Sequence, residues 1–130
     1  MAATRWARRL AVTWILLVLL ASVVDPSGLL AGGGSGAAGP GVDTWAHLAG
    51  YAVLAWVLAA AFGGSERRGA LLAVVVASAV GVGAELLQAP IPTRTASVAD
   101  AVANAVGAVV GAASRTAWRA RGQEESRGGE

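Results

Sequence analysis

Polar and charged side chains interrupt the long apolar stretches of this chain, and these are the residues that could do chemistry. The candidate pocket consists of Asp43, His47, Tyr51, Glu85, Gln88, Arg94, Asp100 and Asn104. In a helix, residues four positions apart share one face, as Asp43, His47 and Tyr51 do. Carboxylates and an imidazole can exchange protons, and an arginine can hold an anionic group. The set therefore suits the binding of a polar ligand or acid and base catalysis.

The other members of the set follow the same rule on two further helices. Asp100 and Asn104 are four positions apart, and Glu85 and Gln88 are three apart, so each pair lies on one helix face. With a rise of about 1.5 Å per residue, Asn104 sits about 6 Å below Asp100, and His47 lies at a similar depth. We expect three helices to bring their polar groups to one level, since ionisable groups inside hydrocarbon are costly unless they pair.

The composition indicates that these helices lie in a membrane. The 130 residues are 55% hydrophobic and 14% charged, and the mean hydropathy is +0.60. A chain this apolar needs lipid to cover its surface. All ten basic residues are arginine, a bias typical of a GC-rich prokaryotic genome. There is no cysteine, which excludes disulfides and thiol chemistry, and a net charge of +2 argues against nucleic acid as a partner.

Four apolar stretches predict an all-α membrane protein. Its four transmembrane helices are expected over about residues 10–30, 43–62, 69–88 and 97–118. Each stretch is close to the ~20 residues with which a helix crosses a bilayer. A glycine-rich loop over 32–41, a charged turn over 63–68 and a proline-containing loop over 89–96 separate them. Residues 1–118 then form one four-helix transmembrane domain, and residues 119–130 form a disordered cytoplasmic tail.

The arginines predict the orientation. They precede the first helix, lie between the second and third, and follow the fourth, and only Arg94 stands elsewhere. By the positive-inside rule the chain is a multi-pass protein of the plasma membrane with both termini cytoplasmic. The polar set then forms an outer-face pocket, in which Arg94 is the counter-ion of Glu85 or Asp100. Trp6 falls near the inner interface and Trp45 near the outer one, as in aromatic belts.

The N-terminus leaves one alternative open. Arg5, Arg8 and Arg9, followed by an apolar run, also resemble a secretory signal, whose cleavage would leave three helices. Leu29 occupies the position at which a cleavage site needs a small residue, so we favour an uncleaved first helix.

Structural roles compete with ligand binding at several of these positions. Asp43 stands where the N-cap of the second helix is expected, and Ser97 with Asp100 three residues later fits a capping box at the fourth. Capping explains these two acids as well as function does. His47 and Asn104 could be hydrogen-bonding residues between packed helices. Glu85 is the strongest functional candidate, because an acid within an apolar helix has no such local role.

Small residues predict how the helices pack. Gly107 and Gly111 form a GxxxG motif, which we expect to bring the fourth helix close to the third. A shift of 57 positions aligns His47 with Asn104 and Gly50 with Gly107. This alignment suggests that the first helical hairpin is a parallel repeat of the second, related to it by an axis along the membrane normal.

The order of these residues resembles the VanZ-like family of small integral membrane proteins. In that family an Asp or Lys and a His open the second helix, E-x-x-Q ends the third, and R-x-x-[ST]-x-x-D-x-x-x-N-x-x-G-x-x-x-G runs through the fourth. This chain has DTWAH at 43–47, ELLQ at 85–88 and RTASVADAVANAVGAVVG at 94–111. The resemblance covers about residues 43–112, and residues 1–42 match only in having an N-terminal helix.

The resemblance implies a function at the cell envelope. The founding member of the family comes from a glycopeptide-resistance cluster and is associated with low-level teicoplanin resistance, while no reaction is established for the family. By analogy, we expect the outer pocket to bind or handle an envelope component such as a lipid headgroup or a lipid-linked glycan. A link to antibiotic resistance rests on this family analogy alone.

Two other classes of function stay open, and no catalytic residue is assigned. One is a membrane-embedded enzyme with acid and base catalysis by Glu85 or Asp100 and His47. The other is a small transporter subunit or a structural membrane protein. We expect no cofactor and no metal site, because one histidine and scattered acids lack a ligand-spacing motif. The expected partners are membrane lipid, an envelope glycan ligand and a second copy of the chain in a homo-oligomer.

Overall fold

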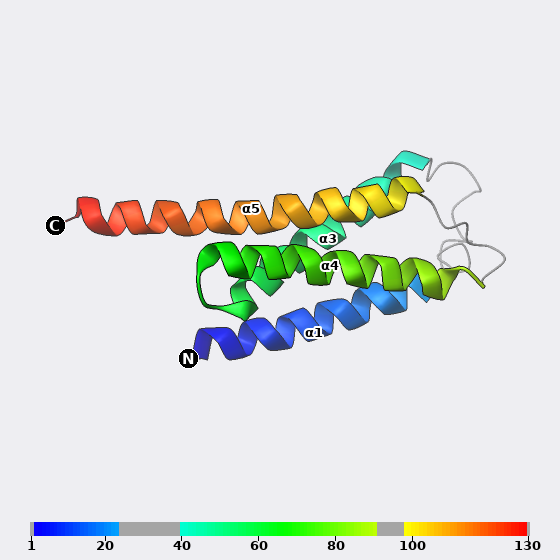
Figure 1. Ribbon diagram of the computed structural model, residues 1–130, viewed down its shortest axis with the longest axis horizontal. Coiled ribbons are helices and arrows are strands. Elements are labelled where there is room, and N and C mark those ends of the chain that lie inside the picture. The colour runs from blue at the N-terminus through cyan, green and yellow to red at the C-terminus, as the bar shows by residue number, and fades with distance from the viewer. Residues whose placement is uncertain (1, 24–39, 91–97, 130) are drawn as a thin grey trace, which may run out of the picture.

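The chain forms an all-α structure of four helices. The computed structural model describes residues 2–23, 40–90 and 98–129. The helices are α1 (Ala2–Val23), α3 (Pro40–Phe62), α4 (Glu66–Gln88) and α5 (Val98–Gly128). Consecutive helices run in opposite directions, so the starts of α1 and α4 and the ends of α3 and α5 lie together (Figure 1). We call this the arginine end, because the arginines of the described residues lie there, and the opposite end the polar end.

Helix α3 is the centre of the bundle. It packs against α1, α4 and α5, and α4 packs against the other three helices. Within the described residues α1 makes no contact with α5, so α5 has only two neighbours. The indole Nε1 of Trp14 donates a hydrogen bond to the carbonyl oxygen of Gly50 at 3.0 Å and ties α1 to α3.

The core is built from small side chains. The buried cluster shared by the four helices is mostly alanine, and Leu54 is the largest side chain that is fully buried. It also contains Ala11, Ala55, Ala73, Ala77, Ala108 and Ala112. Because alanine projects only a methyl group, helix backbones can approach closely along these positions.

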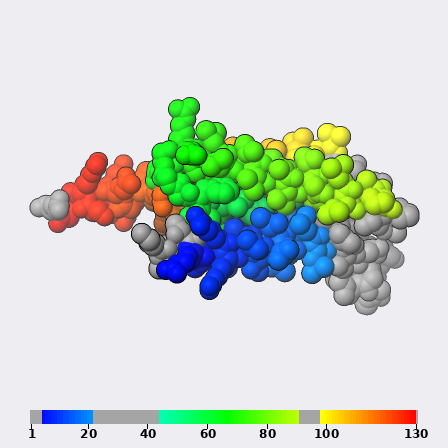
Figure 2. Space-filling view, turned by 60° about the horizontal axis from the view of Figure 1, so that its bottom comes forward, coloured from blue at the N-terminus to red at the C-terminus, as the bar shows by residue number. Residues whose placement is uncertain are grey.

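Large apolar side chains lie on the outside of the bundle. Leu20, Val75 and Leu86 are 62%, 64% and 69% exposed, and the exposed leucines and valines come from all four helices. Figure 2 shows α1 and α4 side by side on one face, with the end of α5 projecting beyond them. Two helical segments, Thr44–Phe62 and Glu66–Gln88, are long and apolar enough to cross a membrane.

Some observed helix boundaries differ from the expected ones. The ends at 62 and 88 coincide with those expected, but α1 begins at Ala2 instead of about residue 10. It begins early because Ala7 is buried against the alanines at the end of α3. The charged residues after 65 belong to the first turn of α4, in which the Gly69 amide donates to the Ser65 carbonyl. The turn itself needs only Gly63 and Gly64, which have φ of 60° and 77°. Residues 24–39 and 91–97 lie outside the described residues.

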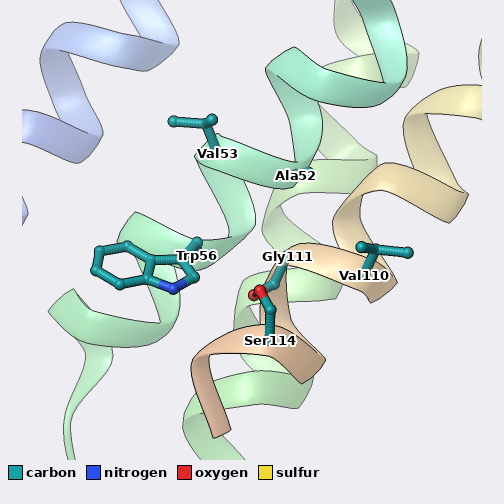
Figure 3. Close-up of a pocket in the computed structure, with 6 residues that line it drawn as sticks. All are labelled: Ala52, Val53, Trp56, Val110, Gly111 and Ser114. Carbon is teal, nitrogen blue, oxygen red and sulfur yellow. Dashed lines mark hydrogen bonds between the residues drawn. The ribbon is translucent and has the colours of Figure 1, made fainter. Parts of the chain in front are cut away.

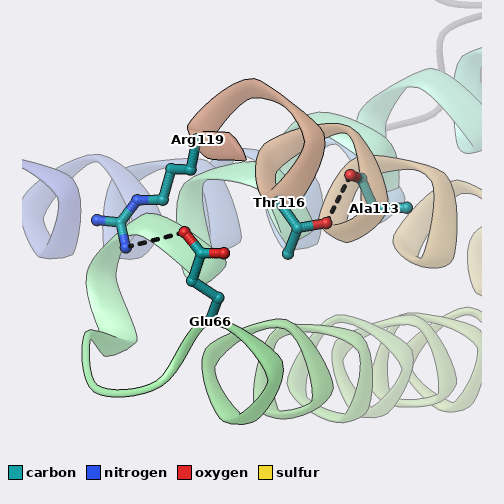
Figure 4. Close-up of polar contacts among 4 residues, drawn as sticks. All are labelled: Glu66, Ala113, Thr116 and Arg119. Atoms are coloured by element: carbon teal, nitrogen blue, oxygen red, sulfur yellow. Dashed lines mark hydrogen bonds and ion pairs between the residues drawn. The ribbon is translucent and has the colours of Figure 1, made fainter. Parts of the chain in front are cut away.

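The expected disordered tail over residues 119–130 is helical as far as Gly128. The physical reason is local, because arginine, glutamine, glutamate and alanine are strong helix formers and Arg121 and Glu125 are an i, i+4 pair. At the start of this extension Arg119 lies 4.0 Å from the Glu66 carboxylate, and one turn earlier Thr116 donates to the Ala113 carbonyl at 2.8 Å (Figure 4).

The GxxxG motif packs against a different helix from the one expected. Gly107 faces the backbone of Leu48 and Gly111 faces that of Ala52, so the closest approach is between α5 and α3. A Cβ atom at either glycine would overlap the facing carbonyl oxygen. Helix α4 also packs against α5, but through Gly81, at which a Cβ would lie 3.3 Å from the Asn104 Cβ.

The expected repeat holds for one helix pair and not for the whole bundle. α3 and α5 run in parallel, and His47 contacts Asn104, its counterpart in the repeat. The rest is not equivalent, because α4 contacts α3 whereas α1 does not contact α5 within the described residues. Gly50 also has open space around it, unlike its counterpart Gly107. The asymmetry has a cause in the sequence, since the bulky Leu54 stands at the position that corresponds to Gly111.

The close approach of α3 and α5 predicts a difference between two glycine substitutions. Gly111→Ala puts a methyl group into the Ala52 carbonyl, so the backbones must separate, and we expect a loss of about 1–3 kcal/mol in the free energy of unfolding. Gly50→Ala enters open space and should be neutral or stabilise the helix by up to about 1 kcal/mol. Chemical unfolding followed by circular dichroism measures both. Equal effects of the two substitutions would contradict the packing described.

Candidate functional site

Two polar contacts join α3 and α5 near the polar end. The His47 Nδ1 atom lies 3.0 Å from the Asn104 Oδ1 atom. One turn nearer the end, the Thr44 hydroxyl donates to an Asp100 carboxylate oxygen at 3.4 Å. Both contacts lie on the side of the helix pair where the glycines of α5 allow the backbones to approach. The structure therefore brings together three of the expected site residues and adds Thr44.

The contact with Asn104 orients the imidazole of His47. An amide oxygen can only accept a hydrogen bond, so in this arrangement the proton of the ring is on Nδ1 and is donated to Asn104. Asn104 is 2% exposed, and its Nδ2 group has no hydrogen-bond partner among the described residues. The Asn104 amide therefore orients the His47 ring through its oxygen, while its Nδ2 group can still donate a hydrogen bond to an acceptor atom of a ligand.

Tyr51 lies one turn further into the bundle. Its ring stacks on that of His47, with centroids 6.5 Å apart and planes 11° from parallel. The side chain is 2% exposed, and its hydroxyl has no hydrogen-bond partner among the described residues. It is not the interfacial belt residue that its type alone would allow, because it is buried within the helix contacts.

Helix α4 closes the cluster on the side of Asn104 and Tyr51. A Cβ at Gly81 would lie 3.2 Å from the Asn104 Nδ2 and 3.3 Å from the Tyr51 Cε1, so only a glycine leaves these groups their full space. The Glu85 carboxylate, one turn nearer the polar end, interacts electrostatically with Tyr51. Gln88 lies on the same face of α4 as Glu85. Its side chain is 5% exposed and is not without an interaction partner.

Two of the expected site residues cannot be placed. Asp43 belongs to the first turn of α3, and its side chain is outside the described residues. Arg94 lies in residues 91–97, which are also outside them. The N-cap role expected for Asp43 is wrong, because α3 begins three residues before it, at Pro40. The role of Arg94 as a counter-ion stays a prediction. In the described parts of the chain no cluster of His, Asp and Glu has a geometry that could hold a metal ion.

Sequence reasoning did not select Thr44 or Gly81 as site residues. Thr44 follows Asp43 in the sequence and is three positions before His47, so the helical spacing that selected the histidine also applies to it. Gly81 could be recognised as part of the site only once the neighbours of α4 were known, because one sequence does not show that a glycine lies next to polar side chains of other helices. Gly83, two residues on, has open space around it.

Comparisons with known proteins add no relative. A scan against protein-family models finds no match, and searches of curated proteins and of solved structures find no significant match. The site must therefore be interpreted from its own residues and geometry.

The contact between His47 and Asn104 predicts a measurable coupling. In a double-mutant cycle of His47→Ala and Asn104→Ala, we expect the two losses of stability to differ from additivity by about 0.5–1.5 kcal/mol, the usual value of such a hydrogen bond. Equilibrium unfolding of the four proteins measures it. The matched control pairs His47→Ala with Thr116→Ala, a residue that bonds within α5, and should be additive. Additivity in the first cycle would contradict the contact.

Proposed function

We propose that this chain is a multi-pass membrane protein whose four helices all cross the bilayer. The support is the distribution of apolar side chains, because alanines fill the core while leucines, valines and tryptophans face outward. A water-soluble protein rarely exposes so large an apolar surface. The two segments that are both long and apolar enough to span a membrane are only 39% and 22% buried in the bundle, so most of their surface needs lipid.

The remaining helices extend the same apolar surface. α5 carries outward valines, among them Val102, Val106 and Val109, and α1 carries outward leucines such as Leu16 and Leu17. Asn104, a polar residue in the apolar part of α5, is buried against α3 and not presented to the surface. All four helices therefore offer lipid an apolar side.

The arginines favour an orientation with the arginine end in the cytoplasm. Arginines of α1, α4 and α5 gather at that end, although they are far apart in the sequence (Figure 1). The positive-inside rule then puts both termini in the cytoplasm and the polar end outside. Trp6 and Trp118 are 48% and 69% exposed near the arginine end, and Trp45 is 70% exposed near the polar end, as expected for residues at the two interfaces.

This orientation can be tested directly, because the chain has no cysteine of its own. Ser65→Cys lies in the exposed turn at the arginine end, and Ala89→Cys lies exposed at the polar end. In intact cells a membrane-impermeant maleimide should label the cysteine at 89 and not the one at 65. Both should react after permeabilisation, which is the control. The reverse pattern would overturn the orientation, and labelling of both in intact cells would overturn the membrane crossing.

We assign the function of the chain to the polar end. In this proposal the chain is a VanZ-like protein of the cell envelope. Its polar end binds the polar part of an envelope component, which is a lipid headgroup or a lipid-linked glycan. The observation that carries this proposal is that Tyr51 and Asn104 keep buried polar atoms without partners among the described residues. Such atoms cost about 1–3 kcal/mol each when left unpaired, and a polar ligand can recover that free energy.

The geometry gives the family pattern a physical meaning. Its aspartate and asparagine, Asp100 and Asn104, face Thr44 and His47 on α3. Its two glycines are the positions at which α5 touches the α3 backbone, one to two turns below. A pattern whose members serve one interface supports kinship with the VanZ-like family, and a link to glycopeptide resistance stays a proposal by analogy.

Retention of a ligand during purification tests this function. The protein is extracted into native-lipid nanodiscs, and native mass spectrometry should show a bound mass beyond that of bulk lipid. Asp100→Asn and Glu85→Gln keep the shape of the side chains and remove the charge, and each should lower the retained mass about tenfold or more. Thr116→Ala, which changes only a bond within α5, is the control. No retained mass in the unchanged protein would mean that the cluster is structural.

An enzyme remains the second candidate, because His47 is oriented by Asn104 in the way that an acid or base needs. The same experiment can distinguish catalysis from binding. Catalysis would be favoured if the unchanged protein releases a ligand of altered mass while a variant such as Asp100→Asn retains the ligand unconverted. A transporter has less support, since the core of the bundle towards the arginine end is alanine and leucine.

A further inference from the structure

A groove with apolar walls runs between α3 and α5, away from the polar cluster. Its volume is about 240 Å³, and it is open along one side. The residues that line it are Ala52, Val53, Trp56, Val110, Gly111 and Ser114. Figure 3 shows Trp56 of α3 and Ser114 of α5 on its two sides. The Ser114 hydroxyl donates to the Gly111 carbonyl at 2.9 Å, so the only hydroxyl in the lining is already paired within its own helix.

The groove exists because of the glycine contact. Gly111 lets α5 approach Ala52 and adds no side chain to fill the space above the contact. Among the described residues only α3 and α5 line the groove, and α5 has contacts with no helix except α3 and α4. The volume is smaller than the roughly 300–1,000 Å³ of pockets for drug-sized ligands, and so it suits a stretch of a single hydrocarbon chain.

A guanidinium group lies at the end of the groove nearest the arginine end. The Arg115 Cζ atom stands 4.8 Å above the centroid of the Trp56 ring, which is one wall of the groove. Its Nε group is buried and has no hydrogen-bond partner among the described residues. Arg115 also interacts electrostatically with Arg119 and Glu66, so this group of three keeps one positive charge.

We propose that this groove holds an acyl chain of an anionic phospholipid from the cytoplasmic leaflet, with the lipid phosphate on Arg115. The proposal rests on the membrane orientation proposed above. Apolar walls suit the acyl chain, and the unpaired Nε with the net positive charge suits the phosphate. Arginines at the inner membrane surface attract anionic lipids in this way.

A second copy of the chain fits this face less well. Two copies that met through the groove in the same membrane orientation would bring their arginine ends together. Like charges at such a distance repel, whereas an anionic lipid neutralises them. The charge at the end of the groove therefore favours lipid over a dimer.

Native mass spectrometry with two probe lipids tests the proposal. The full chain is incorporated in nanodiscs that contain dioleoyl-phosphatidylglycerol and dioleoyl-phosphatidylcholine in equal amounts. We expect about fivefold more phosphatidylglycerol than phosphatidylcholine on the released protein, which corresponds to the roughly 1 kcal/mol of one arginine near an anionic surface. Arg115→Gln should remove this preference, and Arg115→Lys should keep part of it.

Matched variants separate the groove from its surroundings. Ser114→Leu fills the groove and should lower the binding of both lipids, while Ala113→Leu, on the neighbouring exposed position, should not. Arg121→Gln removes an exposed charge further along α5 and should leave the preference intact. Circular dichroism of each variant shows that it is folded.

These measurements can overturn the lipid proposal while the function proposed for the polar end stands. An unchanged phosphatidylglycerol preference in Arg115→Gln or unchanged binding of both lipids in Ser114→Leu would overturn it, and so would a dimer mass in place of bound lipid. Asp100→Asn should leave the preference unchanged, because Asp100 lies at the opposite end of α5. If the cysteine labelling is reversed but the preference follows Arg115, the groove still binds an anionic lipid, but the assignment to the cytoplasmic leaflet falls with the orientation.

Discussion

The contact between two glycines of α5 and the backbone of α3 is the interaction on which the other features of this protein depend. Gly107 and Gly111 leave no side chain between the two helices, so the carbonyls of Leu48 and Ala52 can lie directly opposite them. The parallel helices are then close enough for short polar side chains to meet, and His47 reaches Asn104 at 3.0 Å. Any residue larger than glycine at these positions would move the helices apart and break that contact.

The membrane location that we propose accounts for the small residues that hold the bundle together. In hydrocarbon, apolar side chains gain little by leaving the surroundings for the core, so helices associate through close packing and hydrogen bonds. The observed distribution agrees with this rule, since the core is mostly alanine and glycine while most leucines and valines face outward. Its polar contacts then have two roles, because they hold helices together and also position side chains that could react or bind a ligand. The hydrogen bond of His47 to Asn104 fixes the register of α3 on α5, and it also orients the imidazole.

Helical periodicity in the sequence predicted which residues share a face, but not which helix that face meets. The spacing of His47 and Asn104 placed them correctly at one level, because depth along a helix follows from counting residues. The partner of the GxxxG motif was predicted wrongly, since a pair of glycines marks a close approach without identifying the neighbour. The tail after residue 118 was also predicted wrongly, because its polar composition outweighed the helix propensity of its arginines and glutamates.

The difference between Gly111 and Leu54, its counterpart in the apparent repeat, explains the asymmetry of the bundle. Leu54 is fully buried and makes α3 a helix that other helices surround. Gly111 offers nothing to bury on its outer side, so that flank of α5 stays open and the groove forms there. One interface therefore carries a polar cluster near one end and an apolar groove near the other. Both depend on the same backbone approach of α3 and α5, because Gly107 lies next to the polar contacts and Gly111 lines the groove.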